Sequence, residues 1–330
     1  MRIDSSAPTR IDLAGGTYDI WPLYLFHERA QTINAALSLR ARCTLTARPD
    51  ARVRLVSDDT GEEVPAVDLP SLGVDRLPLL ARLVRHFDAR GVDVRTRSES
   101  PVGAGIAGSS AMNVAVAAAL AVWTGRTLAA DELLTIAMNI EAQVINVPTG
   151  VQDYRPAYYG GVSAVEMDAA GVRRTPIAVD LHELERRIVL AYTGASRNSG
   201  INNWQVMSQR IAGDPVTTAA FDGIRDAALG VRDGLERADW AAVARHLESE
   251  WTHRQRLAPG VTTPAIDALF AAATRAGAVA GKVCGAGGGG CLYCLVDPAR
   301  RDAVAAALTA GGATVLPATL ERQGLQLVRS

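Results

Sequence analysis

The sequence has 330 residues, of which 48% are hydrophobic and 21% are charged, and its formal net charge at pH 7 is -1. A chain of this length can bury a large core and is expected to divide into two domains. The near-neutral charge argues against nucleic acid or an anionic membrane as the main partner. The longest apolar stretch, residues 114–123, is too short to span a bilayer, and the first residues lack the apolar core of a signal peptide, so we expect a cytoplasmic protein.

Hydrophobic periodicity predicts a first half that mixes strands with helices and a second half that is mostly helical until its strand-rich end. In the first half, strands are predicted at 9–14, 31–47, 52–57, 92–98 and 159–167, and helices at about 76–89, 112–123 and 131–145. In the second half, helices are predicted at about 201–211, 216–236, 239–257, 264–276 and 298–309, and strands at 187–192, beside the glycines of 285–290, at 313–317 and at 325–329. The turn-rich segment 168–186 predicts the boundary between a domain of residues 1–180 and a domain of residues 181–330.

A glycine-rich loop, residues 101–111, leads directly into the predicted helix at 112–123. Its glycines at 103, 105 and 108 let the backbone come close to a ligand, and the helix start offers unpaired N–H groups and the positive end of a dipole. Ser109 and Ser110 add hydroxyl groups at that position. The loop therefore predicts an anion site, with phosphate as the expected ligand.

The same residues contain the Gly-x-Gly-x-x-Gly pattern of dinucleotide-binding proteins, so a Rossmann oxidoreductase is an alternative. A strand of a parallel Rossmann sheet is buried on both faces and should be nearly all apolar. Residues 92–100 instead alternate apolar and charged side chains. A second match at 285–290 also shows how readily the pattern arises in a chain with 30 glycines. Both observations argue against the dehydrogenase.

The positions of the lysine, cysteine and histidine residues argue against several kinds of phosphate and metal site. Lys282 is the only lysine, and Val283 follows it, so a Walker-type phosphate loop is excluded. Cys291 and Cys294 lie in an apolar strand without a second pair, and core packing explains them better than a zinc site. His246, Glu250 and His253 share one side of a predicted helix, which we interpret as an ordinary polar face and not a metal site.

Three further segments concentrate polar residues beside glycines. Residues 7–24 place Arg10 before a Gly-Gly turn and Asp19 after it, where the turn could present the carboxylate to a polyol. Residues 141–161 place Glu141 and Asp153 on either side of a turn. Residues 281–291 are so rich in glycine that something must approach their backbone closely. Each of these residues taken singly is equally well explained as a surface or capping group.

Taken in order, the segments resemble the motif series of the GHMP kinases, the family of galactokinase, homoserine kinase, mevalonate kinase and phosphomevalonate kinase. The first motif is Ala-Pro-x-Arg-Ile-x-Leu-Ala-Gly-Gly-x-x-Asp at 7–19, the second is Pro-x-Gly-x-Gly-x-x-x-Ser-Ser-Ala at 101–111, and the third is Gly-Ala-Gly-Gly-Gly-Gly at 285–290. Within the family the chain is most similar to sugar kinases that act on D-glycero-D-manno-heptose 7-phosphate, with fucose kinases next. Segments at 150–161, 192–199 and 251–290 support that placement.

The resemblance implies an α+β, two-domain fold with the active site in the cleft between the domains. It implies transfer of the γ-phosphoryl group of ATP, with Mg²⁺, to a hydroxyl of a sugar or sugar phosphate, and we expect the anomeric hydroxyl. The protein would then be a monomer or homodimer whose partner is its small-molecule substrate. The alternatives are a family member with a non-sugar acceptor, such as mevalonate or an amino-alcohol, and a catalytically degenerate, nucleotide-binding regulatory protein.

By the same resemblance, roles follow for individual residues. Asp153 would accept or orient the proton of the acceptor hydroxyl, and Arg10 would steady Asp153 and the transferring group. Ser110 and Glu141 would bind Mg²⁺. The ATP phosphates would be held by Pro101, Gly103, Ala104, Gly105, Ile106, Ala107, Gly108, Ser109, Ser110 and Ala111. The acceptor would be held by Asp19, Gly16, Thr17, Gln152, Gly287 and Gly288, with Arg197 on a second anion such as a sugar phosphate.

The chain departs from the family pattern at two of these positions. Arg10 stands where mevalonate and homoserine kinases usually carry lysine, although arginine there resembles the heptose kinase group. Ala107 replaces a glycine that is common in the loop, and its side chain makes the backbone less permissive. The resemblance therefore does not predict the backbone conformation at Ala107.

Overall fold

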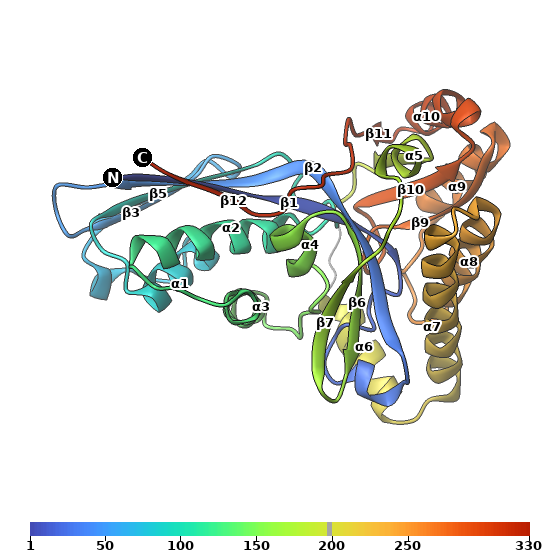
Figure 1. Ribbon diagram of the computed structural model, residues 1–330, viewed down its shortest axis with the longest axis horizontal. Helices are drawn as coiled ribbons and strands as arrows, with labels where there is room; N and C mark the ends of the chain where they lie inside the picture. The colour runs from blue at the N-terminus through green and yellow to red at the C-terminus, as the bar shows by residue number, and fades with distance from the viewer. Residues whose placement is uncertain (197–199) are drawn as a thin grey trace.

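The computed structural model describes residues 1–196 and 200–330. It contains two β-sheets with helices packed against them (Figure 1). The first sheet has the strand order β12-β1-β2-β5-β3-β4, with β6 paired to β2 and β7 paired to β6. Its strands are β1 (Arg2–Ala14), β2 (Ala30–Ala47), β3 (Val53–Ser57), β4 (Glu62–Val67), β5 (Val92–Ser98), β6 (Val162–Asp168), β7 (Gly171–Pro176) and β12 (Gln326–Arg329). The second sheet has the order β11-β8-β10-β9, built from β8 (Ile188–Tyr192), β9 (Ala278–Val283), β10 (Cys291–Val296) and β11 (Thr314–Val315).

Helices of the first half lie on one face of the first sheet (Figure 1). These helices are α1 (Pro78–Phe87), α2 (Gly108–Trp123), α3 (Ala130–Ile145) and α4 (Tyr154–Tyr159). The helices of the second half are α5 (Leu181–Arg186), α6 (Gly200–Ile211), α7 (Pro215–Glu236), α8 (Trp240–Arg254), α9 (Pro264–Ala276) and α10 (Arg301–Ala310). In the second half, α8, α9 and α10 pack on the second sheet, α7 packs on α8 and on β1 and β2, and α6 contacts α7. Short 3-10 turns are η1 (Leu23–Phe26), η2 (Leu69–Ser71) and η3 (Pro298–Arg300). Among the residues described, no helix is both long and apolar enough to cross a membrane.

The long strand β2 organises the first sheet. Residues 41–47 pair with β5 and residues 30–35 pair with β6, while β1 runs antiparallel along most of its length. In β5 the buried residues Val92, Val94 and Thr96 alternate with more exposed charged residues, so this strand buries one face against the helices. The alternation that argued against a Rossmann strand is therefore a property of the folded sheet.

Helix α2 lies beneath β1 and β2 and is almost wholly buried, as its alanine-rich sequence predicted. Small side chains let the helix pack closely on the strands, and Ser5 donates a hydrogen bond to its backbone at Ala115. A second apolar cluster joins the two halves, because Ile11 and Ile33 of the first sheet pack with Val231 of α7 and Tyr293 of β10. The position of α2 fixes the glycine-rich loop at the helix start.

Several short elements differ from the sequence prediction. Helix α2 begins at Gly108, four residues before the predicted start, and β1 begins at Arg2 instead of residue 9. The elements β4, β7, α4 and α5 were not predicted, because each has only 6 residues, too few to display a periodic pattern, and β4, β7 and α4 contain a proline. The proposed division at residue 180 stays a prediction: the second sheet begins with β8, while β12 at the end of the chain pairs with β1.

Candidate active site

A cavity of about 560 Å³ opens where segments of both halves meet. Its walls come from the end of β1 and the turn after it, the β3–β4 connection, the starts of α1, α2 and α4, and the end of α3. The second half adds Asn203 of α6, Arg254 of α8 and the loop residues Gly285 and Ala286. Segments far apart in the sequence are thus brought to one site.

The glycine-rich loop forms one wall and ends in the first turn of α2. Gly103 and Gly105 have φ angles of 70° and 74°, a region that glycine adopts freely. Ala107 also adopts the left-handed region, with φ 60° and ψ 35°, and it is the residue before the helix. No side chain of the described residues caps this helix start, so its first N–H groups and the positive end of its dipole are available to an anion in the cavity.

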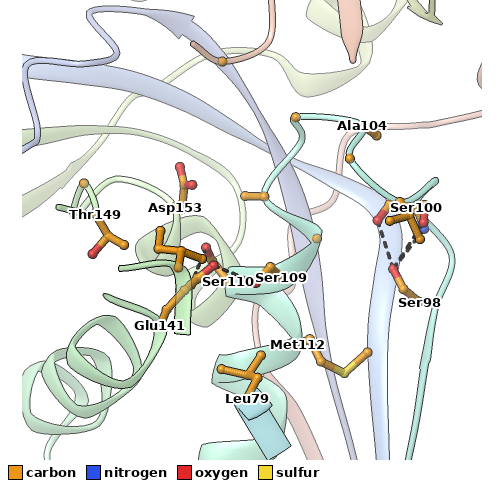
Figure 2. Close-up of a pocket in the computed structure, with 18 of the residues that line it drawn as sticks. Leu79, Ser98, Ser100, Ala104, Ser109, Ser110, Met112, Glu141, Thr149 and Asp153 are labelled. Carbon is orange, nitrogen blue, oxygen red and sulfur yellow. Dashed lines mark hydrogen bonds between the residues drawn. The ribbon is translucent and has the colours of Figure 1, made fainter. Parts of the chain in front are cut away.

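Glu141 of α3 faces this helix start (Figure 2). Its Oε1 accepts a hydrogen bond from Ser109 Oγ at 2.6 Å, and its Oε2 accepts from Ser110 Oγ at 2.9 Å and from the Tyr154 hydroxyl at 2.7 Å. Burial raises the pKa of the Glu141 carboxyl, while the three hydroxyl donors oppose that effect. A hydroxyl and a carboxylate are hard oxygen ligands, so the pair Ser110 and Glu141 suits Mg²⁺ that keeps waters and phosphate oxygens as its other ligands.

Arg10 and Asp153 form an ion pair at the cavity wall. Arg10 is 2% exposed, and its Nη2 and Nε donate to Asp153 Oδ1 at 2.6 Å and 2.9 Å. Its Nη1 donates to the carbonyl oxygens of Gly105 (3.0 Å) and Cys284 (2.9 Å). One guanidinium therefore holds Asp153, the glycine-rich loop and the residue before the third motif. Both of its bonds to Asp153 end on Oδ1, so Arg10 does not bond to Oδ2.

Asp19 is 2% exposed and lies close to Gly150 and Gln152. Its Oδ2 accepts a hydrogen bond from the backbone N–H of Gln152 at 3.0 Å. Burial raises the pKa of this carboxyl to about 7, and the charge of the nearby Asp153 contributes in the same direction. A side chain on residue 150 would place its Cβ 1.8 Å from Asp19 Oδ2, so it would displace the Asp19 carboxylate.

The opposite end of the cavity has walls that the sequence analysis did not identify. Leu79 and Met112 give it an apolar surface, and Ser98 and Ser100 add hydroxyl groups that are 2.9 Å apart (Figure 2). Leu77 extends the apolar surface. Leu79 belongs to α1 and Met112 to α2, and both were assigned only to helices. No motif identifies an apolar surface of this kind, because it forms only when two helices pack.

The structure places most of the predicted site residues on the cavity wall, but not all of them. Gly287 and Gly288 pack against the turn at Gly260 and Val261, and Gly285 and Ala286 line the cavity in their place. Gly16, Ile106 and Ala111 also lie behind the wall, where Gly16 packs on the Asp12 carboxylate. Arg197 lies outside the described residues.

The polar face predicted at His246, Glu250 and His253 is wrong in one respect, because Glu250 is fully buried. The two histidines pack instead against α7, where Gly230 and Gly223 leave room for their rings. In the described part of the chain, no group of three or more His, Cys, Asp or Glu side chains could hold a metal ion.

Comparison with protein families decides which enzymes the chain resembles. The model of the GHMP kinases N terminal domain matches residues 77–161, and the model of the GHMP kinases C terminal region matches residues 231–314. The chain belongs to the GHMP kinases. As a GHMP kinase it has an α+β fold and uses ATP as its phosphate donor, as the motif series implied.

Individual GHMP kinases are similar over three quarters of this chain or more. D-glycero-alpha-D-manno-heptose 7-phosphate kinase of Campylobacter jejuni is 29% identical over 310 residues, which cover 91% of each chain. Mevalonate kinase of Thermococcus onnurineus is 28% identical over 75% of this chain and 72% of its own. A crystal structure of a D-glycero-D-manno-heptose 1-phosphate kinase from Bacteroides thetaiotaomicron superposes with a TM-score of 0.80 at 25% identity and covers 99% of both chains.

Proposed function

We propose that this GHMP kinase transfers the γ-phosphoryl group of ATP to a hydroxyl of a sugar phosphate, with the anomeric hydroxyl of a heptose phosphate as the first candidate. The observation that carries the proposal is the Arg10–Asp153 pair, which lies on the same cavity wall as the helix start with Ser109, Ser110 and Glu141. Phosphoryl transfer needs alignment and charge neutralisation more than covalent catalysis. These two groups supply an acidic residue for the acceptor and an anion site for the donor.

On the donor side, the N–H groups at the start of α2 and the backbone of the glycine-rich loop bind the ATP phosphates. The apolar end lined by Leu79 and Met112 accepts the base. Ser110 and Glu141 hold Mg²⁺, which neutralises charge on the phosphates when it is bound. Because the loop and the helix start are fixed by Arg10 and by the first sheet, the donor phosphates are held at a defined distance from Asp153.

On the acceptor side, Asp153 orients the acceptor hydroxyl and accepts its proton through Oδ2, the oxygen that Arg10 leaves unused. Asp19, Thr17 and Gln152 present hydrogen-bonding groups to the other hydroxyls. The raised pKa of Asp19 lets this carboxyl donate as well as accept near neutral pH. Such a polar wall suits a polyol better than mevalonate, whose own carboxylate would face Asp19 and Asp153.

The phosphate group of a sugar-phosphate acceptor needs a cation to bind it. The arginines of the described cavity wall are Arg10 and Arg254, and both are already paired with carboxylates. We therefore retain Arg197 for this role, as the sequence predicted.

The test is an ADP-release assay with heptose 7-phosphate, heptose 1-phosphate, fucose, galactose, mevalonate and homoserine. We expect the highest kcat/KM with a heptose phosphate, and Asp153→Asn should lower kcat about 10²- to 10⁴-fold, the usual contribution of a general base. Asp88→Asn is the matched control, since Asp88 is exposed at the end of α1. A preference for mevalonate, or equal turnover by Asp153→Asn and wild type, would contradict the proposal.

A further inference from the structure

On the acceptor side the structure holds a buried cluster of four charged residues, Asp12, Glu250, Arg254 and Lys282, to which the proposed reaction assigns no role. Asp12 and Arg254 border the cavity, and Glu250 and Lys282 lie behind them. Each is at most 2% exposed. Lys282 Nζ donates to Asp12 Oδ2 at 2.8 Å and to the Asp12 carbonyl at 3.0 Å, and it lies 3.5 Å from Glu250 Oε1. Arg254 Nε donates to Glu250 Oε1 at 2.9 Å. Two anions balance two cations, so the cluster can stay charged away from water.

This cluster makes a hydrogen bond to each residue of the turn at residues 15–17. Glu250 Oε1 accepts from the Gly15 backbone N–H at 3.3 Å. Arg254 Nη2 donates to the Gly16 carbonyl at 2.9 Å, and its Nη1 donates to Thr17 Oγ1 at 3.1 Å. The turn belongs to the first half of the chain, whereas Glu250 and Arg254 come from α8.

The turn needs such support, because its backbone is strained. Thr17 has a φ of 75°, a conformation that is rare and costly for a β-branched residue. Asp19 follows two residues later, and the amides of Tyr18 and Ile20 bond back to the carbonyls of Gly15 and Thr17. A change in the turn therefore moves Asp19.

We infer that Arg254 is a positioning residue of this enzyme, which holds the strained turn at residues 15–17 so that Asp19 faces the acceptor. Asp12, Glu250 and Lys282 hold Arg254 in the orientation that this requires. Arg254 acts on acceptor binding through Thr17 and Gly16, and it does not act on the ATP end of the cavity. The inference adds a long-range control of acceptor affinity to the proposed function.

The variants Arg254→Lys and Thr17→Val test whether Arg254 positions the turn. Lysine keeps the charge balance but loses the fork that reaches the turn, and valine keeps the shape of Thr17 but removes the oxygen that accepts from Arg254. Each should raise the acceptor KM about 10-fold or more and leave the KM for ATP within about 2-fold. The double variant should raise the acceptor KM by less than the product of the two single effects, because both changes remove the hydrogen bond from Arg254 to Thr17. The control is Arg245→Lys, at an exposed position of α8.

The kinetic measurement rests on the proposed function, so amide hydrogen exchange provides a readout that does not. Exchange in peptides covering residues 15–20 should be at least about 10-fold faster in Arg254→Lys, while peptides covering 101–111 stay as in wild type. Unchanged exchange at 15–20, additive effects of the two variants, or an equal rise in the KM for ATP would overturn the inference. If the wild type phosphorylates no sugar phosphate but the exchange result holds, the proposed acceptor is wrong and the positioning role stands.

Discussion

Among single residues, Asp19 makes the free energy of unfolding depend on pH. Its folded-state pKa is about 7, against an ordinary value of 3.8, so between these values the folded protein keeps a proton that the unfolded chain releases. The free energy of unfolding therefore falls as the pH rises through this window, by at most about 4 kcal/mol.

Asp19→Asn should remove this dependence. We expect the variant to be more stable than wild type at pH 8 and to lose that advantage at pH 4, measured by urea unfolding across the range. Parallel stability curves for the two proteins would show that the carboxyl is already ionised in the folded state at pH 5. Because Asn cannot ionise, the same variant should also flatten the pH profile of the acceptor KM near pH 7.

Ala107 is a second residue with a measurable consequence. It adopts the left-handed conformation, which costs a residue with a side chain about 1–2 kcal/mol, while glycine adds about 0.5–1 kcal/mol of unfolded-state entropy. Ala107→Gly should therefore raise the free energy of unfolding by up to about 1 kcal/mol. Ala129→Gly, at a residue with φ -66°, is the control and should give no gain. A loss of stability in Ala107→Gly would mean that the methyl group contributes more by packing than it costs in strain.

At the scale of elements, α7 and α8 pack closely because two glycines face two histidines. A Cβ on Gly230 would lie 2.4 Å from the His246 ring, and a Cβ on Gly223 would lie 2.3 Å from the His253 ring. Gly230→Ala improves helix propensity by about 1 kcal/mol, but the overlap should outweigh that gain and lower stability by about 1–3 kcal/mol.

Removing the His246 ring should suppress the effect of Gly230→Ala. In the background His246→Ala, the change Gly230→Ala should become neutral or stabilising, which a double-mutant cycle of thermal unfolding can measure. An additive cycle would contradict the packing. The sequence could not show this contact, since the two residues lie on different helices and only the crossing of α7 and α8 brings them together.

Elements with long periodic patterns were predictable, and so were the parts of the site that lie within one segment. The loop at 101–111 and the turns around Asp19 and Asp153 carry local glycine and proline signals, which a single sequence displays. The cluster around Arg254 does not, because Lys282 and Asp12 are 270 positions apart and Arg254 and Gly16 are 238 apart. In the sequence, Lys282 excludes one class of phosphate loop and shows no other role, and the helical spacing of Glu250 predicts a polar face although this residue is buried.

At the scale of the whole molecule, the two halves share structure and should not unfold independently. The first sheet packs directly on α7 and β10, and the charged cluster joins β1 to α8 and β9. We expect one cooperative urea transition, with tryptophan fluorescence and far-UV circular dichroism giving the same midpoint. Tryptophans occur in both halves, at positions that include Trp123 and Trp251, so two separate midpoints would be detected and would contradict this expectation.

The pairing of β12 with β1 has a further consequence. The first and last residues lie side by side, with Arg2 and Ser330 exchanging backbone hydrogen bonds (Figure 1). A short peptide linker could therefore join the ends and make the backbone circular, and new ends could be opened at the exposed turn at Ala169 and Ala170, between β6 and β7, which does not line the cavity. The order in which this chain leaves the ribosome is then only one of several orders that could produce the same enzyme.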